Sequence, residues 1–145
     1  MTDMYENLKK IIDKSHRIVF FGGAGVSTES GVPDFRSENG LYQAMQTFGR
    51  PPEEMLSYSF FRGHMNTFFD YYKNNLIYRE AKPNPAHLAL AELEKLGKLT
   101  AVVTQNIDGL HQMAGSEKVW ELHGSVQRNY CMDCDTFYDL EYIMD

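Results

Sequence analysis

Short apolar runs that end in glycine or in polar residues occur three times along the chain. Residues 17–21, 99–103 and 119–122 are each nearly all apolar, which is typical of strands buried in a parallel sheet. Residues 3–15 show instead the spacing of an amphipathic helix. Strands that alternate with helices predict an α/β fold with an open, Rossmann-like parallel sheet.

Two further segments have helical patterns. Asn84 is a capping residue, Pro85 suits the first position of a helix, and Gly97 can end the helix that follows. Residues 42–78 hold ten of the eighteen Tyr and Phe residues in broken helical spacing, as in Phe68-Phe69. For most of these rings this spacing favours a helical core.

Polar clusters follow the predicted strands at their carboxyl ends, where ligands bind in open α/β sheets. They are the turn Gly23-Ala24-Gly25, the segment 105–108, and His123. Two glycines after a strand let the backbone approach a phosphate closely, although many tight turns use the same residues. Thr28 stands where a dinucleotide-binding turn has its third glycine, and no acidic residue follows at a second strand. An ordinary hydride-transferring dehydrogenase is therefore disfavoured.

Asp34-Phe35-Arg36 and His123 each allow two interpretations. Phe35 can lie over a planar ring and Arg36 can pair with a phosphate, or Phe35 belongs to the core and Arg36 pairs with a nearby carboxylate. A lone histidine is more often structural than catalytic, but His123 ends a strand at the predicted ligand edge, which gives the two interpretations equal weight. The other histidines are interpreted as surface, packing or structural residues: His16, His64, His87 and His111.

Cys131 and Cys134 are the two cysteines of the sequence, spaced as in a zinc knuckle. Strand-like residues flank them, at 128–130 and 135–138. That context differs from the helix start of a thioredoxin-like redox motif. Because a closed structural zinc site needs four ligands, the pair amounts to half a site.

Composition narrows the class of protein further. A chain of 145 residues is long enough for one core. The net charge of −6, without a dense stripe of Lys and Arg, argues against nucleic-acid binding. No apolar run is long enough to span a membrane, and the N-terminus has no signal-peptide core. The expected location is therefore cytoplasmic.

Taken together, these motifs resemble the sirtuins, the NAD-dependent protein-lysine deacylases, and in particular the N-terminal portion of a bacterial-type member. They follow one another across nearly the whole chain in the family's order. The stretches that carry the likeness are 23–27, 30–37, 82–84, 104–108, 121–124 and the cysteine pair. The resemblance implies NAD-dependent removal of acetyl or other acyl groups from protein lysines, with release of nicotinamide and O-acyl-ADP-ribose.

The resemblance also implies an organisation into modules. Residues 1–38 and 81–125 would form a Rossmann-like NAD-binding domain whose sheet is incomplete. Residues 39–80 would form an inserted helical module, and residues 126–145 the first half of a zinc-ribbon module. Cys131 and Cys134 would be zinc ligands, and the partner would be an acyl-lysine protein or peptide.

Site residues carry over from the family by position. The resemblance implies catalytic roles for His123, as general base, and for Asn106. Contacts with NAD are implied for the glycine turn, the loop after it and the 105–108 segment, with Phe35 beside the nicotinamide. These residues are Gly23, Ala24, Gly25, Thr28, Asp34, Phe35, Arg36, Gln105, Asn106, Ile107, Asp108 and His123.

The second cysteine pair and the adenosine-binding loops of sirtuins have no counterpart in this sequence. We therefore expect a fragment in which the zinc site and the adenosine half-site are incomplete. Two alternatives stay open. One is a module that binds NAD or ADP-ribose without turnover, which needs the glycine turn but not His123. The other is a small zinc-knuckle interaction protein, which needs only Cys131 and Cys134.

Overall fold

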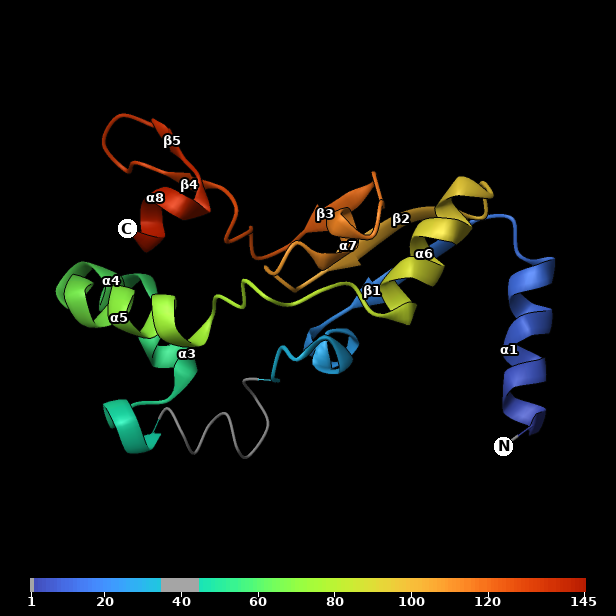
Figure 1. The fold of residues 1–145 in the computed structure, drawn as a ribbon, viewed down its shortest axis with the longest axis horizontal. Coiled ribbons are helices and arrows are strands. Elements are labelled where there is room, and N and C mark those ends of the chain that lie inside the picture. Colours follow the sequence, from blue (N-terminus) through green and yellow to red (C-terminus); the bar gives the residue numbers. More distant parts are fainter. Residues whose placement is uncertain (1, 35–44) are drawn as a thin grey trace.

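A computed structural model describes residues 2–34 and 45–145, and Figure 1 shows the course of the chain. The amino-terminal half contributes α1 (Thr2–Lys14), β1 (Ile18–Gly22), the 3-10 turns η1 (Ala24–Val26) and η2 (Thr28–Ser30), α3 (Pro52–Met55), α4 (Tyr58–Gly63) and α5 (Met65–Asn75). The rest contributes α6 (Pro85–Lys95), β2 (Leu99–Thr104), α7 (Leu110–Met113), β3 (Val119–Glu121), β4 (Asn129–Tyr130), β5 (Phe137–Tyr138) and α8 (Leu140–Met144).

The three predicted strands form one parallel sheet in the order β1-β2-β3. Phe21 lies opposite Val103, and Val103 lies opposite Trp120. This pairing confirms the α/β class and the parallel sheet. Because the strands run the same way, their carboxyl ends meet at one edge, and the polar clusters that follow them are brought together there.

Helix α6 covers one face of the sheet. Leu90 from α6 packs with Leu99 and Val102 of β2, and Ile18 and Phe20 of β1 join this core. The helix begins as predicted, with Asn84 as its cap and Pro85 in its first turn. After it ends, Gly97 adopts a left-handed conformation with φ of 69°.

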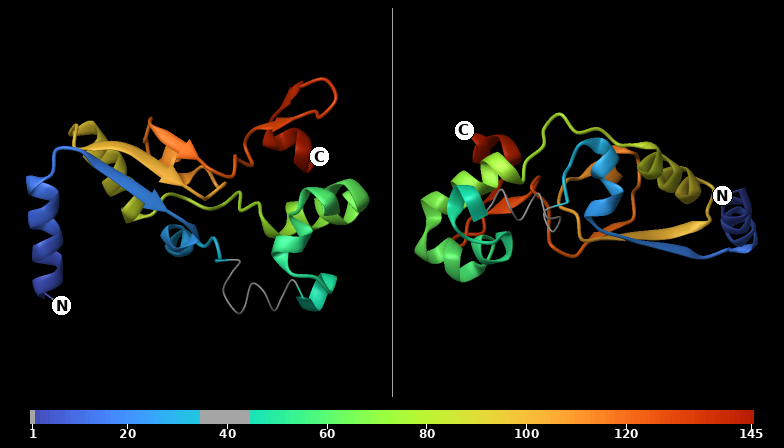
Figure 2. Two further views of the ribbon diagram at one scale, coloured as in Figure 1. Left: turned by 180° about the vertical axis from the view of Figure 1, so that it is seen from behind. Right: turned by 90° about the horizontal axis from the view of Figure 1, so that it is seen from below.

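The other face of the sheet is open to solvent in the described ranges. Successive side chains of a strand point to opposite faces, so Val19 and Phe21 lie opposite the α6 side. They are 59% and 62% exposed, and Trp120 on β3 is 67% exposed. Helix α1 stands beyond the end of the sheet rather than on this face (Figures 1 and 2). Lys98 holds its last turn by donating to the carbonyls of Ile12 and Asp13, both at 3.0 Å.

The aromatic segment forms the helices α3, α4 and α5, which lie at the other end of the molecule from α1 (Figure 1). Its buried core consists of Met55, Phe60, Tyr71 and Leu76, called here the helical core. The prediction that aromatic rings of this segment form a helical core is therefore confirmed for Phe60 and Tyr71. A break at His64 divides α4 from α5, because its φ of −141° and ψ of 48° are not helical.

A two-stranded antiparallel hairpin, β4–β5, and helix α8 follow the sheet. The two short strands predicted around the cysteines are therefore present. An ion pair between Arg79 and Glu141 connects the segment after α5 to α8. Among the helices of residues 2–34 and 45–145, none is long and apolar enough to cross a membrane.

Candidate active site

The glycine turn leaves β1 through Gly22, where an added side chain requires a neighbouring ring to move. A Cβ on Gly22 would collide with the ring of Phe20. The chain then forms η1 and η2, and it leaves them through Gly31, whose φ of 82° favours glycine. Thr28 stands where a third glycine was expected, and its hydroxyl donates to the carbonyl of Gly25 at 3.1 Å. The turn is therefore closed by a side chain instead of continuing into a long helix.

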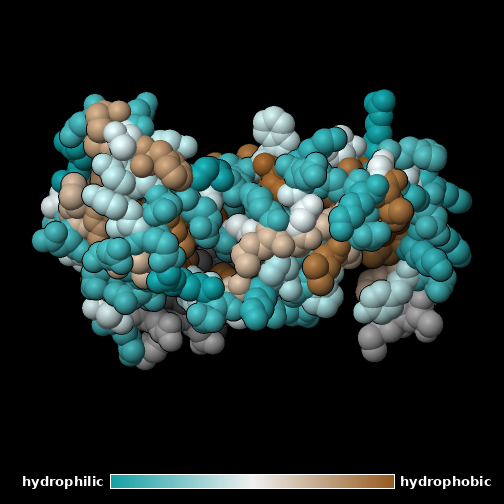
Figure 3. Space-filling model, turned by 45° about the horizontal axis from the view of Figure 1, so that its top comes forward, coloured by the Kyte–Doolittle hydropathy of each residue, from teal (hydrophilic) through white to brown (hydrophobic). Residues whose placement is uncertain are grey.

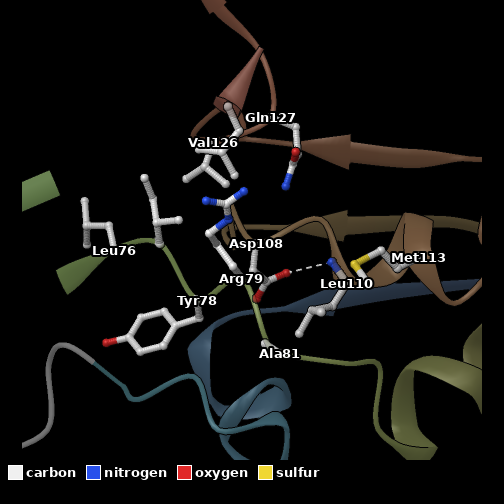
Figure 4. Close-up of a pocket in the computed structure, with 11 residues that line it drawn as sticks. Leu76, Tyr78, Arg79, Ala81, Asp108, Leu110, Met113, Val126 and Gln127 are labelled. Carbon is white, nitrogen blue, oxygen red and sulfur yellow. Dashed lines mark hydrogen bonds between the residues drawn. The ribbon is translucent and has the colours of Figure 1, made fainter. Parts of the chain in front are cut away.

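A network of hydrogen bonds joins this turn to the segment after β2. The Ser27 hydroxyl donates to Asp108 Oδ2 at 2.7 Å, and the Asn106 amide donates to Ser27 Oγ at 2.9 Å. The same amide donates to Asp108 Oδ2 at 3.2 Å. The backbone N–H of Leu110 donates to Asp108 Oδ1 at 2.9 Å, the dashed line in Figure 4. These bonds hold Asn106 and Asp108 in a fixed relation at the sheet edge.

Two buried histidines lie behind the network. The N–H of Asn84 donates to Nδ1 of His87 at 3.3 Å, which leaves the proton of this ring on Nε2. Nε2 lies 3.5 Å from Ser27 Oγ. The ring centroid of His111 lies 4.7 Å from that of His87. Burial lowers the pKa of both rings, so both are neutral at pH 7.

The pKa of His111 falls furthest, to about 4, because burial is reinforced by the neighbouring His87 and only partly opposed by Asp108. Neither of its ring nitrogens has a hydrogen-bond partner within the described part of the chain. Its ring instead lies against His87 and Phe20, with a centroid distance of 5.8 Å to the latter. The orientation of His111 is therefore set by packing.

His123 follows β3, as predicted, and is exposed. Its Nδ1 lies 3.0 Å from the carbonyl oxygen of Gln105. A carbonyl only accepts, so Nδ1 carries the proton and Nε2 keeps its lone pair. Gln105 is itself fixed, because its N–H donates to the carbonyl of Gly22 at 3.0 Å. The Nε2 atom of His123 is therefore the ring nitrogen left for other partners at the sheet edge.

The glycine turn, the 105–108 segment and His123 line one cleft of about 830 Å³. Its lining includes most of the predicted site residues that the structure describes: Gly23, Ala24, Gly25, Asp34, Gln105, Asn106, Ile107, Asp108 and His123. Thr28 lies outside the lining, although its side chain closes the turn. Phe35 and Arg36 fall outside the described residues. A second cavity, of about 50 Å³, lies on the other side of Asp108 between Tyr78, Met113 and Val126 (Figure 4).

Ser27, His87 and His111 have site contacts that sequence reasoning did not predict. Ser27 lies inside the glycine motif, but the motif alone does not assign a role to its hydroxyl. His87 occupies the third position of α6, where its ring completes a capping box with Asn84. That position after a capping residue was the one available signal, because a capping box needs an acceptor there. Nothing in the sequence places His111 beside it.

The cysteine pair lies in the turn of the β4–β5 hairpin. The N–H of Asp135 donates to the carbonyl of Cys131 at 3.0 Å, and Asp135 itself has a left-handed φ of 57°. Cys134 Sγ lies 3.1 Å from Thr136 Oγ1. Hydrogen bonds from Thr136 and from Cys131 lower the pKa of Cys134, which favours the thiolate that metals bind. The donors suit two of four zinc positions, and residues 2–34 and 45–145 contain no cluster of three or more metal-binding side chains.

The fold and the site define an α/β protein with a polar cleft at the carboxyl edge of a parallel sheet. The sequence profile of the Sir2 family matches residues 23–145. This chain is similar to the NAD-dependent protein deacetylases of Clostridium acetobutylicum and Clostridium tetani. The sequence identities are 60% and 64%, and each alignment covers 99% of this chain. The chain spans 59% and 58% of their lengths.

Solved structures agree with this relationship. A Sir2 enzyme structure superposes with a TM-score of 0.82 at 43% identity, over 99% of this chain and 57% of that one. A Sir2 homologue in complex with NAD superposes with a TM-score of 0.80 at 39% identity, over 94% of this chain and 52% of that one. The chain belongs to the Sir2 family.

Proposed function

We propose that the protein removes acetyl groups from lysine side chains of proteins in an NAD-dependent reaction. Relatives that are 60% and 64% identical to this chain are NAD-dependent protein deacetylases. The observation that carries the proposal is the tautomer of His123. Its Nδ1–H is engaged with Gln105, so the basic Nε2 lies at the cleft that the glycine turn and the 105–108 segment also line.

NAD would bind in this cleft and supply the nicotinamide leaving group and the ADP-ribose that accepts the acyl group. Ala24, Asp34, Phe35 and Arg36 would contact the cofactor, and Thr28 would hold the turn in shape. Asn106 would face the ribose with Gln105. Ile107 and Asp108 would hold the carboxamide, whose N–H groups suit a carboxylate acceptor. Ser27 and the Leu110 N–H keep that carboxylate oriented.

His123 would act as the general base. An imidazole nitrogen that carries no proton can take one from a ribose hydroxyl within hydrogen-bond reach. The hydrogen bond to Gln105 stabilises the ring orientation and the positive charge that follows proton transfer. The substrate partner would be an acyl-lysine peptide. A related Sir2 structure contains a deacetylated p53 peptide and 3′-O-acetyl ADP-ribose.

Zinc would be structural rather than catalytic. Cys131 and Cys134 would supply two of its ligands, and two more would come from other parts of the full-length protein. The division into a nucleotide-binding domain (1–38 and 81–125), a helical module (39–80) and a zinc module (126–145) belongs to the same proposal. The segment between Arg79 and the sheet would connect the first two.

Replacement of His123 tests the proposal. In the full-length protein, His123→Ala should lower nicotinamide release from NAD and an acetyl-lysine peptide by about 10²–10⁴-fold, the usual effect of losing a general base. His16→Ala, which changes an exposed histidine outside the cleft, should leave the rate unchanged. A folded His123→Ala variant that releases nicotinamide at the parent rate would contradict the proposal and favour an NAD-binding module without turnover.

A further inference from the structure

Strand β3 ends on a carboxylate that the proposed chemistry leaves without a role. The side chain of Glu121 is only 6% exposed, whereas Leu122 and His123, which follow it directly, are exposed. Burying a carboxylate costs free energy unless the group is paired and hydrogen-bonded. The partners of Glu121 therefore show what this carboxylate holds together.

Both oxygens of this carboxylate accept hydrogen bonds from side chains of other segments. Nε2 of Gln112, in α7, donates to Oε1 at 2.8 Å. Arg128, in the segment that leads from β3 to β4, donates to Oε2 and forms an ion pair with it (Figure 1). One side chain of β3 is thus tied both to α7 and to the segment before the cysteine hairpin. The three residues Gln112, Glu121 and Arg128 are called here the Glu121 clamp.

The backbone turn that carries His123 starts from the same residue. Glu121 lies opposite Thr104 in the sheet, and the N–H of Leu122 donates to the carbonyl of Thr104 at 2.9 Å. Gly124, with a left-handed φ of 78°, donates its N–H to the carbonyl of Glu121 at the long distance of 3.5 Å. The turn therefore closes on Glu121, and a displacement of this residue would move the turn with it.

The ring of His123 depends on this turn because the side chain is exposed and packing does little to hold it. Its Nδ1 reaches the carbonyl of Gln105, which follows the neighbouring strand β2. The bond therefore joins the ends of two strands, and it forms only while the end of β3 keeps its place beside β2. Loosening the end of β3 would weaken the bond and, with it, the preference of the ring proton for Nδ1.

We infer that Glu121 is a positioning residue for His123. Held by Gln112 and Arg128, its carboxylate fixes the turn that keeps Nδ1 of His123 on the Gln105 carbonyl and leaves Nε2 for the cleft. The inference rests on the proposed function, in which Nε2 takes a proton. It adds a residue that acts through His123 and exchanges no proton with the substrate.

Glu121→Gln tests the inference while keeping the size of the side chain. Both carboxylate oxygens accept, whereas an amide has one acceptor and one donor group and can satisfy either Gln112 or Arg128 but not both. In the full-length protein with NAD and an acetyl-lysine peptide, kcat should fall by about 10–10²-fold, since a misplaced catalytic group can cost that much. The affinity for NAD, measured by calorimetry, should stay the same, because no member of the Glu121 clamp lines the cleft.

Glu94 provides a matched control at the other end of the same strand. Its carboxylate accepts hydrogen bonds from the N–H groups of Glu117 and Lys118, at 3.1 and 2.9 Å, just before β3 begins. Glu94→Gln should weaken the start of the strand and leave kcat at the parent value. An equal fall of kcat in Glu94→Gln and Glu121→Gln would mean that both carboxylates only stabilise β3, which would overturn the inference.

The tautomer of His123 gives a readout that does not depend on turnover. Nitrogen NMR of the full-length protein, labelled in histidine, distinguishes a neutral ring with its proton on Nδ1 from one with its proton on Nε2. His123→Ala identifies the signal of this ring. The parent and Glu94→Gln should carry the proton on Nδ1, and Glu121→Gln should shift it towards Nε2. A ring that keeps its proton on Nδ1 in Glu121→Gln would overturn the inference, whatever the rate.

A double substitution separates positioning from a general structural role. If Glu121 acts through His123, Glu121→Gln should lower the rate no further once His123 is alanine. An equal fold-loss in both backgrounds would assign Glu121 a structural role and overturn the inference, while the proposed function would stand. If His123→Ala itself turns over at the parent rate, the proposed function fails, and the tautomer measurement still decides whether Glu121 positions the ring.

Discussion

At the scale of single residues, the protonation state of one ring determines where a distant hydroxyl points. His87 lies 60 positions after Ser27 in the chain. Because Asn84 donates to Nδ1 of His87, the proton on Nε2 faces Ser27 Oγ. The Ser27 hydroxyl then has its own proton available for Asp108. A proton added to Nδ1 would break the bond from Asn84 and disturb this chain of donors.

His111 makes the folded state sensitive to acid. Its pKa is about 4 when folded and near 6.5 when unfolded, so between these values only the unfolded chain binds the proton. The contribution of the neutral His111 ring to the free energy of unfolding is therefore fully present above pH 6.5, and it falls as the pH drops towards 4. Between pH 7 and pH 5 the loss from His111 alone amounts to about 2 kcal/mol. Urea unfolding at the two pH values measures it.

His111→Phe should remove this loss, because it replaces the two unpartnered ring nitrogens with carbon. Burial also lowers the pKa of His87, so part of the acid sensitivity remains. His64→Phe alters an exposed ring at the start of α5 and should keep the full sensitivity. Equal loss of stability in His111→Phe and in the parent would show that the buried ring does not titrate as described.

At the scale of elements, the pattern of apolar runs was sufficient for the sheet. Strands β1, β2 and β3 lie where the three runs predicted them, because a buried parallel strand leaves a continuous apolar signature. The start of α6 followed from Asn84 and Pro85, since capping chemistry is local. The break at His64 was not predicted, although Gly63 stands directly before it, because a single glycine inside a helical pattern does not by itself specify a break.

Contacts between elements were the part that sequence could not supply. Placement at the carboxyl ends of strands was enough to group the glycine turn, Asn106, Asp108 and His123. The bonds among Ser27, His87 and Asp108 connect the junction of η1 and η2 with α6 and with the loop after β2. Such contacts depend on how α6 packs on the sheet. Periodicity identifies which face of the helix is apolar, but it does not identify which polar side chain is buried beside it.

The β4–β5 hairpin leads to a prediction about metal content. The 145-residue chain as a monomer should not hold one tightly bound zinc, because Cys131 and Cys134 supply two thiolates and structural zinc takes four ligands. Two chains that pool their cysteines could share one ion. Elemental analysis together with the mass in solution measures the ratio.

Matched variants make the metal measurement specific. Cys134→Ser should abolish any zinc that the chain retains, whereas Asp133→Asn, an exposed neighbour in the same turn, should not change it. One zinc per monomeric chain, lost in Cys134→Ser, would mean that this sequence supplies a complete ligand set and that the half-site interpretation is wrong.

At the scale of the whole molecule, apolar residues are distributed unevenly between the two faces of the sheet. Leu90 of α6 is buried with Leu99 and Val102 of β2 between the helix and the sheet, whereas Val19 and Trp120 on the opposite face are open to solvent. The space-filling view in Figure 3 shows hydrophobic side chains reaching the surface among polar ones. The described chain therefore has a core on one side of its central sheet.

That open face has an optical consequence. The sequence contains one tryptophan, Trp120, and its side chain is already 67% exposed in the folded chain. Its emission should resemble that of indole in water and be readily quenched by acrylamide. Urea should then change the fluorescence little while the far-ultraviolet circular dichroism collapses. A blue-shifted, poorly quenched emission would mean that something covers the indole, and titration of a covering partner would be visible without any added dye.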